Sequence, residues 1–251
     1  MCFYHYKLKI ALIAFLIINL CNACVHDSID NKQHHYKTWI TDSKQAILEL
    51  KKGNDRFLHD KSIHHHYLEE IEQTKEGQHP HSIILSCMDS RVPPEIIFDQ
   101  GIGNIFTVRV AGNIEDSNVL ASIEYAIKYA HTPLIVVMAH NHCGAVKGAL
   151  KNINVSHLTQ LAEQIKPSIP KNKNSNTNNH GIPREHVEFD EISDETAKKN
   201  IHQTIIDILH KSELIKSYYA KKDIDIIGAF YNIESGKVEF YTSYLDLNIN
   251  Q

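Results

Sequence analysis

Residues 134–143 read Leu-Ile-Val-Val-Met-Ala-His-Asn-His-Cys, an apolar run that ends in two imidazoles and a thiol. The five apolar side chains that follow Pro133 suit a strand buried on both faces. Strands of that kind belong to parallel sheets, whose two faces are covered by helices. The stretch therefore predicts an α/β domain in which His140 and Cys143 follow the carboxyl end of a central strand.

A second stretch has the same layout. The short apolar strand expected over residues 82–86 runs directly into Cys87-Met88-Asp89-Ser90-Arg91. In open parallel sheets, ligands bind beyond the carboxyl ends of the strands. Cys87 and His140 lie far apart in the sequence, but they become neighbours if their two strands are adjacent.

The rest of the chain alternates between helical and strand patterns. Helices are expected within 41–76, with a break at Gly53-Asn54, and over 94–98, 117–130, 143–165 and 194–220; further strands are expected over 105–110, 224–231 and 237–241. A polar loop rich in Pro, Asn and Ser is expected around 166–193. The alternation predicts a mostly parallel central β-sheet flanked by helices, in a single catalytic domain over residues 41–251.

Residues 1–23 have the layout of a signal peptide, because two lysines precede the apolar run 10–18, which is short for a membrane span. Cleavage after Ala23 would give a secreted or periplasmic protein. Alternatively, the segment is a lipoprotein signal, and a lipid on Cys24 anchors the mature chain to a membrane; a retained N-terminal anchor is a third option. Residues 24–40 are expected to form a linker.

Composition limits the class of protein. The chain has 251 residues, 42% of them hydrophobic, and a formal net charge of −4, which suits one domain with a full core and argues against nucleic acid as a partner. After removal of a signal and lipidation of Cys24, Cys87 and Cys143 are the only cysteines left. A disulfide between them is the competing interpretation in an oxidising compartment, but it leaves His140 without a role.

Cys87, His140 and Cys143 together predict a zinc site. Two thiolates and a neutral imidazole can hold one Zn²⁺ ion per subunit and leave its fourth position for water, as catalytic zinc requires. His140 is preferred to His142 because a three-residue step to Cys143 lets both side chains turn inward. Adjacent side chains tend to diverge.

Asp89 and Arg91 add an acid and a base to this site. Asp89 can accept a hydrogen bond from zinc-bound water and orient the resulting hydroxide toward an electrophile. Arg91 can form a bidentate pair with Asp89 and keep the carboxylate ionised. When unpaired, Asp89 can instead swing onto the zinc as a fourth ligand and close the site.

The pattern Cys-x-Asp-x-Arg followed by His-x-x-Cys resembles that of the β-class carbonic anhydrases. The similarity continues through residues 98–101, 108–113, 122–126, 228–231 and 236–238. The resemblance implies a lyase that uses zinc-bound hydroxide to hydrate CO2 reversibly to bicarbonate and a proton.

The same resemblance implies a substrate pocket and an oligomer. Gln78, Phe106 and Tyr125 match the positions of the glutamine, phenylalanine and tyrosine that surround CO2 in the family, some of them supplied by a partner subunit. An apolar wall suits CO2, and an amide can polarise one of its oxygens. A homodimer or higher homo-oligomer with the cleft at the subunit interface is therefore expected.

Two alternatives stay open. A relative on the same scaffold could hydrolyse CS2 or COS, and the motifs barely separate such an enzyme from a carbonic anhydrase. A zinc-stabilised binding protein without turnover is the non-enzymatic alternative. Its mark would be loss of Asp89 or Arg91, and both residues are present.

Overall fold

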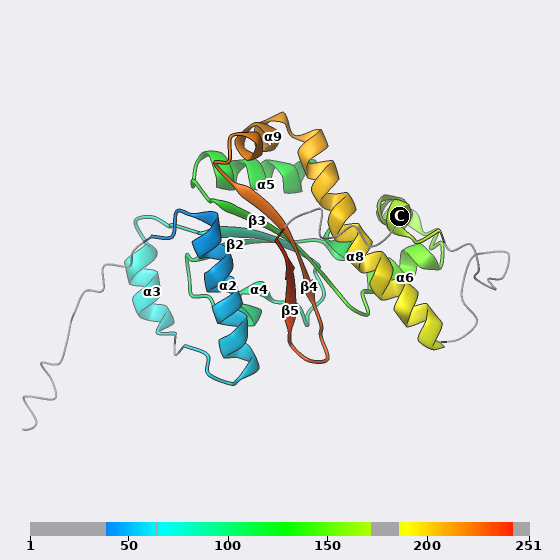
Figure 1. Cartoon of the computed structure of the whole chain (residues 1–251), viewed down its shortest axis with the longest axis horizontal. Helices are drawn as coiled ribbons and strands as arrows, with labels where there is room; N and C mark the ends of the chain where they lie inside the picture. The colour runs from blue at the N-terminus through cyan, green and yellow to red at the C-terminus, as the bar shows by residue number, and fades with distance from the viewer. Residues whose placement is uncertain (1–38, 64, 172–185, 243–251) are drawn as a thin grey trace, which may run out of the picture. The chain divides into compact units, whose positions relative to one another are not determined.

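A five-stranded sheet lies at the centre of the computed structural model, which describes residues 39–63, 65–171 and 186–242 (Figure 1). Its strands are β1 (Ser82–Ser86), β2 (Ile105–Arg109), β3 (Leu134–His140), β4 (Asp225–Tyr231) and β5 (Val238–Tyr241), in the order β2-β1-β3-β4-β5. The first four strands pair in parallel, and β5 is antiparallel to β4. The predicted α/β fold with a mostly parallel sheet is thereby confirmed.

Helices cover both faces of this sheet (Figure 1). They are α2 (Ser43–Leu58), α3 (Tyr67–Thr74), α4 (Pro94–Ile97), α5 (Ser117–Lys128), α6 (Gly144–Leu150), α7 (Ser156–Ile165), α8 (His186–Lys211) and α9 (Glu213–Ala220), with 3-10 turns at Ala111–Asn113 and Lys166–Ser168. All seven residues of β3 are buried. Ile135 and Val137 belong to the core layer under α5 and α8, whereas Val136 and Met138 belong to the layer under α2 and α4. Alternate side chains thus fill opposite layers, as the apolar run predicts.

Helix α2 runs without interruption through Gly53-Asn54, so the break predicted there is wrong. A Cβ atom at Gly53 would lie 1.8 Å from the carbonyl oxygen of Phe98, so only glycine allows this close approach. The buried Asn54 donates from Nδ2 to the Ile97 carbonyl at 3.2 Å, and its Oδ1 accepts from the first amide of β5 at 2.9 Å. The pair therefore serves packing against two other segments.

Three other boundaries differ from the sequence-based expectation. The helix expected over 143–165 is divided into α6 and α7, because Asn152 takes a positive φ of 51° after α6. The long C-terminal helix is divided where Ser212 caps α9 by accepting from the Ile215 amide at 3.1 Å. Helix α8 already begins at His186, inside the expected loop 166–193.

The predicted signal segment 1–23, Cys24 and most of the linker 24–40 lie outside the described residues. Among the residues that are described, no helix combines the length and apolar character needed to cross a bilayer.

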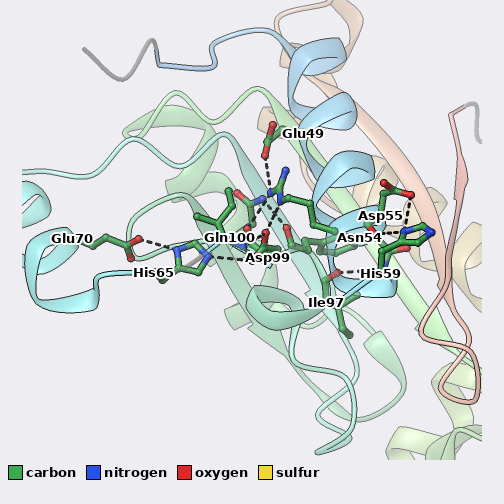
Figure 2. Close-up of polar contacts among 12 residues, drawn as sticks. Glu49, Asn54, Asp55, His59, His65, Glu70, Ile97, Asp99 and Gln100 are labelled. Carbon is green, nitrogen blue, oxygen red and sulfur yellow. Dashed lines mark hydrogen bonds and ion pairs between the residues drawn. The ribbon is translucent and has the colours of Figure 1, made fainter. Parts of the chain in front are cut away.

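Asp99 anchors the segment between α2 and α3 to the end of α4 (Figure 2). Its side chain is 2% exposed and accepts a hydrogen bond from Nε of Arg56 at 2.5 Å. The amide of Ile63 donates to both carboxylate oxygens, at 3.1 and 3.0 Å. His65 bridges Asp99 Oδ1 at 3.3 Å and Glu70 Oε1 at 2.8 Å. One carboxylate therefore joins three segments of the chain.

Replacing this carboxylate should weaken the fold in a pH-dependent way. Burial by itself raises the pKa of Asp99, but the hydrogen bonds from Arg56 and the Ile63 amide outweigh burial and lower it. A lowered pKa means that the stabilisation is complete above the unfolded value of about 3.9 and is lost as the pH falls through the folded value. We expect Asp99→Asn to reduce the free energy of unfolding by about 2–4 kcal/mol at pH 7.

Urea unfolding of both proteins at pH 7 and pH 3 tests this expectation, because the difference between them should shrink at the lower pH. Asp55→Asn is the control, since Asp55 lies on α2 next to Arg56 but its side chain is 73% exposed. An equal loss at both pH values would contradict the assigned role of the Asp99 carboxylate.

Candidate metal centre

Two adjacent strands and one helix bring Cys87, His140 and Cys143 together. Cys87 directly follows β1, His140 is the last residue of β3, and Cys143 is the N-cap of α6. Because β1 and β3 pair in parallel, their carboxyl ends meet at one edge of the sheet. All three residues are buried, and their ligand atoms lie within 4.8 Å of one another. The structure thus gathers the three residues that the sequence nominates as ligands.

The donor set of this cluster fits zinc. The Sγ atoms of Cys87 and Cys143 are 3.9 Å apart as free thiols, and two sulfurs bound tetrahedrally at about 2.3 Å from zinc would be about 3.8 Å apart. His140 donates from Nδ1 to the carbonyl of Asn141 at 2.8 Å, while its buried Nε2 has no hydrogen-bond partner. A second-sphere bond of this kind sets the tautomer that leaves Nε2 free as a ligand atom.

The two thiols affect each other's protonation. The hydrogen bond with Cys143 is the main cause that lowers the pKa of Cys87, to about 4, against the opposing effect of burial. The same contact, together with burial, raises the pKa of Cys143. The contact therefore favours negative charge on Cys87 over negative charge on Cys143. A bound cation favours loss of the second proton, because metal binding and thiol deprotonation are coupled.

Arg109 and Gly112, at and just after the carboxyl end of β2, also contact residues 87–89. The sequence did not nominate them as part of the site. The amide of Gly112 donates to Cys87 Sγ at 3.4 Å. Arg109 donates from Nε to the Cys87 carbonyl at 3.2 Å and from Nη2 to the Asp89 carbonyl at 2.5 Å. Arg109 pairs with Ser86 in the sheet. Its position at the carboxyl end of a strand was the signal that could have found it.

Asp89 and Arg91 form a bidentate ion pair beside the cluster. Nε and Nη2 of Arg91 donate to Oδ1 and Oδ2 of Asp89 at 2.9 and 2.8 Å, and the Arg91 amide donates to Oδ1 at 3.0 Å. The hydrogen bond from the Arg91 side chain holds the pKa of Asp89 well below its usual range. Asp89 is therefore an ionised acceptor. Paired in this way, it stands outside the group of three side chains that could hold a metal ion.

The loop after β3 is held by the turn between β4 and β5. The Ile233 amide donates to Asn141 Oδ1 at 2.8 Å. His142 has a positive φ of 54° and places Nε2 2.9 Å from Glu234 Oε1. These contacts direct His142 to the turn and leave the cluster to His140, as the spacing argument predicts.

The three residues nominated for the substrate pocket do not all come together. Phe106 and Tyr125 line one hollow of about 530 Å³ beside β2 and α5, and Tyr125 is 56% exposed. Gln78 is exposed between α3 and β1 and does not line that hollow. Phe106 pairs with Ile83, which places it about 13 Å from the ligand edge at a rise of about 3.3 Å per residue.

Residues 82–238 match the carbonic anhydrase family model. Carbonic anhydrase 2 of Mycobacterium tuberculosis is 35% identical over 203 residues, which cover 78% of this chain and 92% of that protein. The carbonic anhydrase of Mycolicibacterium smegmatis is 32% identical over 204 residues, 79% of this chain and 93% of that protein.

Solved structures show the same fold. The β-carbonic anhydrase CcaA has a TM-score of 0.58 at 25% identity, covering 80% of this chain and 98% of that chain. CafA of Aspergillus fumigatus has a TM-score of 0.60 at 19% identity, covering 82% of this chain and 94% of that chain. Together with the Cys87, His140 and Cys143 cluster, these similarities show that the chain belongs to the β-class carbonic anhydrase family of enzymes.

Proposed function

We propose that this protein catalyses the reversible hydration of CO2 to bicarbonate and a proton, with zinc held by Cys87, His140 and Cys143. The observation that carries the proposal is the buried cluster of two thiols and one imidazole, with an ionised carboxylate beside it. Zinc in such a site supplies a Lewis acid that lowers the pKa of a water molecule toward neutrality.

Asp89 orients the reacting water in this proposal. An ionised carboxylate can only accept hydrogen bonds. Asp89 therefore accepts a hydrogen bond from the water, and this contact leaves an oxygen lone pair of the water directed at the carbon of CO2. Arg91 keeps Asp89 ionised and limits its rotation through the bidentate pair. Arg109 contributes by fixing the backbone of Cys87 and Asp89 in one arrangement.

Gln78, Phe106 and Tyr125 are proposed to surround CO2 at the site of a second copy of the chain. Within one chain, the α-carbon of Phe106 lies about 13 Å along the sheet from the ligand edge, which is too far for its side chain to touch a substrate at that chain's own metal. The hollow that Phe106 shares with the exposed Tyr125 offers an apolar surface to a partner. Tetrameric β-carbonic anhydrases are known from Sordaria macrospora. We propose a homodimer or higher homo-oligomer here.

The N-terminal segment supports a proposal on location. A pair of lysines, an apolar run and the small residues up to Ala23 are typical of an export signal. We propose a secreted or periplasmic protein, either free or anchored through a lipid on Cys24. The mass of the mature chain distinguishes these two forms.

Stopped-flow CO2 hydration combined with elemental analysis of the same full-length sample tests the proposed activity. We expect about one zinc ion per subunit, as for a catalytic site, and a hydration rate proportional to the zinc content. Hydrolysis of CS2 or COS without CO2 hydration would assign the protein to the alternative enzyme class. Zinc-loaded protein inactive on all three gases would indicate a binding protein.

A further inference from the structure

Asn200 is buried in α8, far from Cys87 in the sequence, and both ends of its amide are held. Its side chain is 1% exposed. Nδ2 donates to the carbonyl oxygen of Gly112 at 2.8 Å. Oδ1 accepts from Ser168 Oγ at 3.3 Å. The Asn200 amide is thus a fixed donor aimed at one backbone carbonyl.

Gly112 is the residue whose amide reaches the metal-site sulfur. Its N–H donates to Cys87 Sγ at 3.4 Å. Its φ of 71° and ψ of 17° lie in the left-handed region, and a Cβ there would approach Ile165 Cδ1 to 2.7 Å. Glycine is required here, but glycine also has the greatest backbone freedom. A contact from outside the turn is needed to hold the direction of its N–H.

We propose that Asn200 is a positioning residue that directs the Gly112 N–H at Cys87 Sγ by holding the Gly112 carbonyl on the other side of the same α-carbon. This inference rests on the proposed zinc site. A hydrogen bond to a thiolate draws negative charge away from the metal–sulfur bond, and groups of this kind tune the metal from outside its ligand shell. The effect matters most where two thiolates already reduce the positive charge on the ion.

The same helix offers a matched control. Thr204 lies one turn after Asn200, is 2% exposed, and donates from Oγ1 to the carbonyl of Asn113 at 3.4 Å. It therefore makes a buried bond to the neighbouring carbonyl of the same turn. The hydrogen bond to the sulfur of Cys87 comes from Gly112 and not from Asn113. Thr204→Val therefore removes a comparable buried hydrogen bond to the turn while leaving the contact between Asn200 and Gly112 in place.

The test uses the full-length protein loaded with Co²⁺, whose sulfur-to-metal charge-transfer absorption reports the charge on the thiolates. We expect Asn200→Leu to move this absorption to longer wavelength and to lower the affinity for Zn²⁺, measured by competition with a chelator, about 10-fold, the size of effect that is typical of outer-shell partners. Thr204→Val should leave the absorption in place. An unshifted absorption in Asn200→Leu, or an equal shift in Thr204→Val, would reduce Asn200 to a structural residue.

A measurement on the unmodified chain guards against a variant that fails to fold. With ¹¹³Cd in the site, we expect a scalar coupling between the metal and the Gly112 amide proton, transmitted through the hydrogen bond to Cys87 Sγ. Its absence would overturn the proposal. Neither readout depends on turnover, so a protein inactive on CO2 that shows the coupling and the shift would refute the proposed activity alone.

Discussion

Cys143→Ser should remove nearly all zinc from the protein and, with it, CO2 hydration. A serine hydroxyl stays protonated at neutral pH, whereas zinc binds deprotonated ligands. The position is 1% exposed, so bulk water has no free access to replace the lost sulfur. We expect the zinc content after dialysis to fall from about one ion per subunit to less than about one tenth. Elemental analysis measures it directly.

The control for this experiment is the neighbouring residue. His142→Gln changes the same loop, but His142 contacts Glu234 and not the cluster. Its zinc content should stay near that of the unmodified protein. Full occupancy in Cys143→Ser would remove Cys143 from the ligand set. Loss of zinc in His142→Gln would instead show that the loop as a whole, and not the thiol, retains the metal.

Asp89→Ala should reduce CO2 hydration by about 100-fold or more while zinc stays bound, as expected for a group that handles a proton of the reacting water. Without the carboxylate, nothing holds the water in the orientation that presents a lone pair to CO2, so the loss should fall on kcat. In the unmodified protein, Arg91 holds both carboxylate oxygens of Asp89. The variant removes this partner of Arg91. Stopped-flow assays at matched zinc content provide the measurement.

Glu95→Gln is the matched control for Asp89→Ala. Glu95 is an exposed carboxylate on α4, a short distance along the chain, and it accepts a hydrogen bond from Thr107 Oγ1 at 2.7 Å. Removing its charge should leave turnover near that of the unmodified protein. Undiminished hydration in Asp89→Ala would refute the role assigned to the carboxylate.

Local sequence predicted the sheet and the metal cluster because both depend on short stretches. A strand buried on both faces needs a continuous apolar run, and residues 134–138 and 82–86 supply two of them. In neighbouring parallel strands, the residues that follow such runs meet at one edge of the sheet. The sequence alone therefore placed Cys87 and His140 close together.

Helix boundaries were less predictable because the competing interactions come from distant segments. Gly53 reads as a helix breaker, but the free energy gained by packing α2 on the Phe98 carbonyl outweighs its low helix propensity. The placement of the substrate residues stays a prediction. Motif positions do not say which chain's metal Phe106 and Tyr125 serve, and the sheet register separates the backbone of Phe106 from its own chain's cluster.

The sequence by itself determined the α/β class, the grouping of Cys87, His140 and Cys143, and the Asp89–Arg91 pair, since each is encoded in short stretches at strand ends. Only the tertiary structure decided that His142 turns to Glu234, that Arg109 supports the Cys87 loop, and that Asn200 holds Gly112 beside the sulfur. These contacts join residues far apart along the chain. These contacts form only when the helices and strands pack against one another, so the spacing of residues within a short stretch does not predict them.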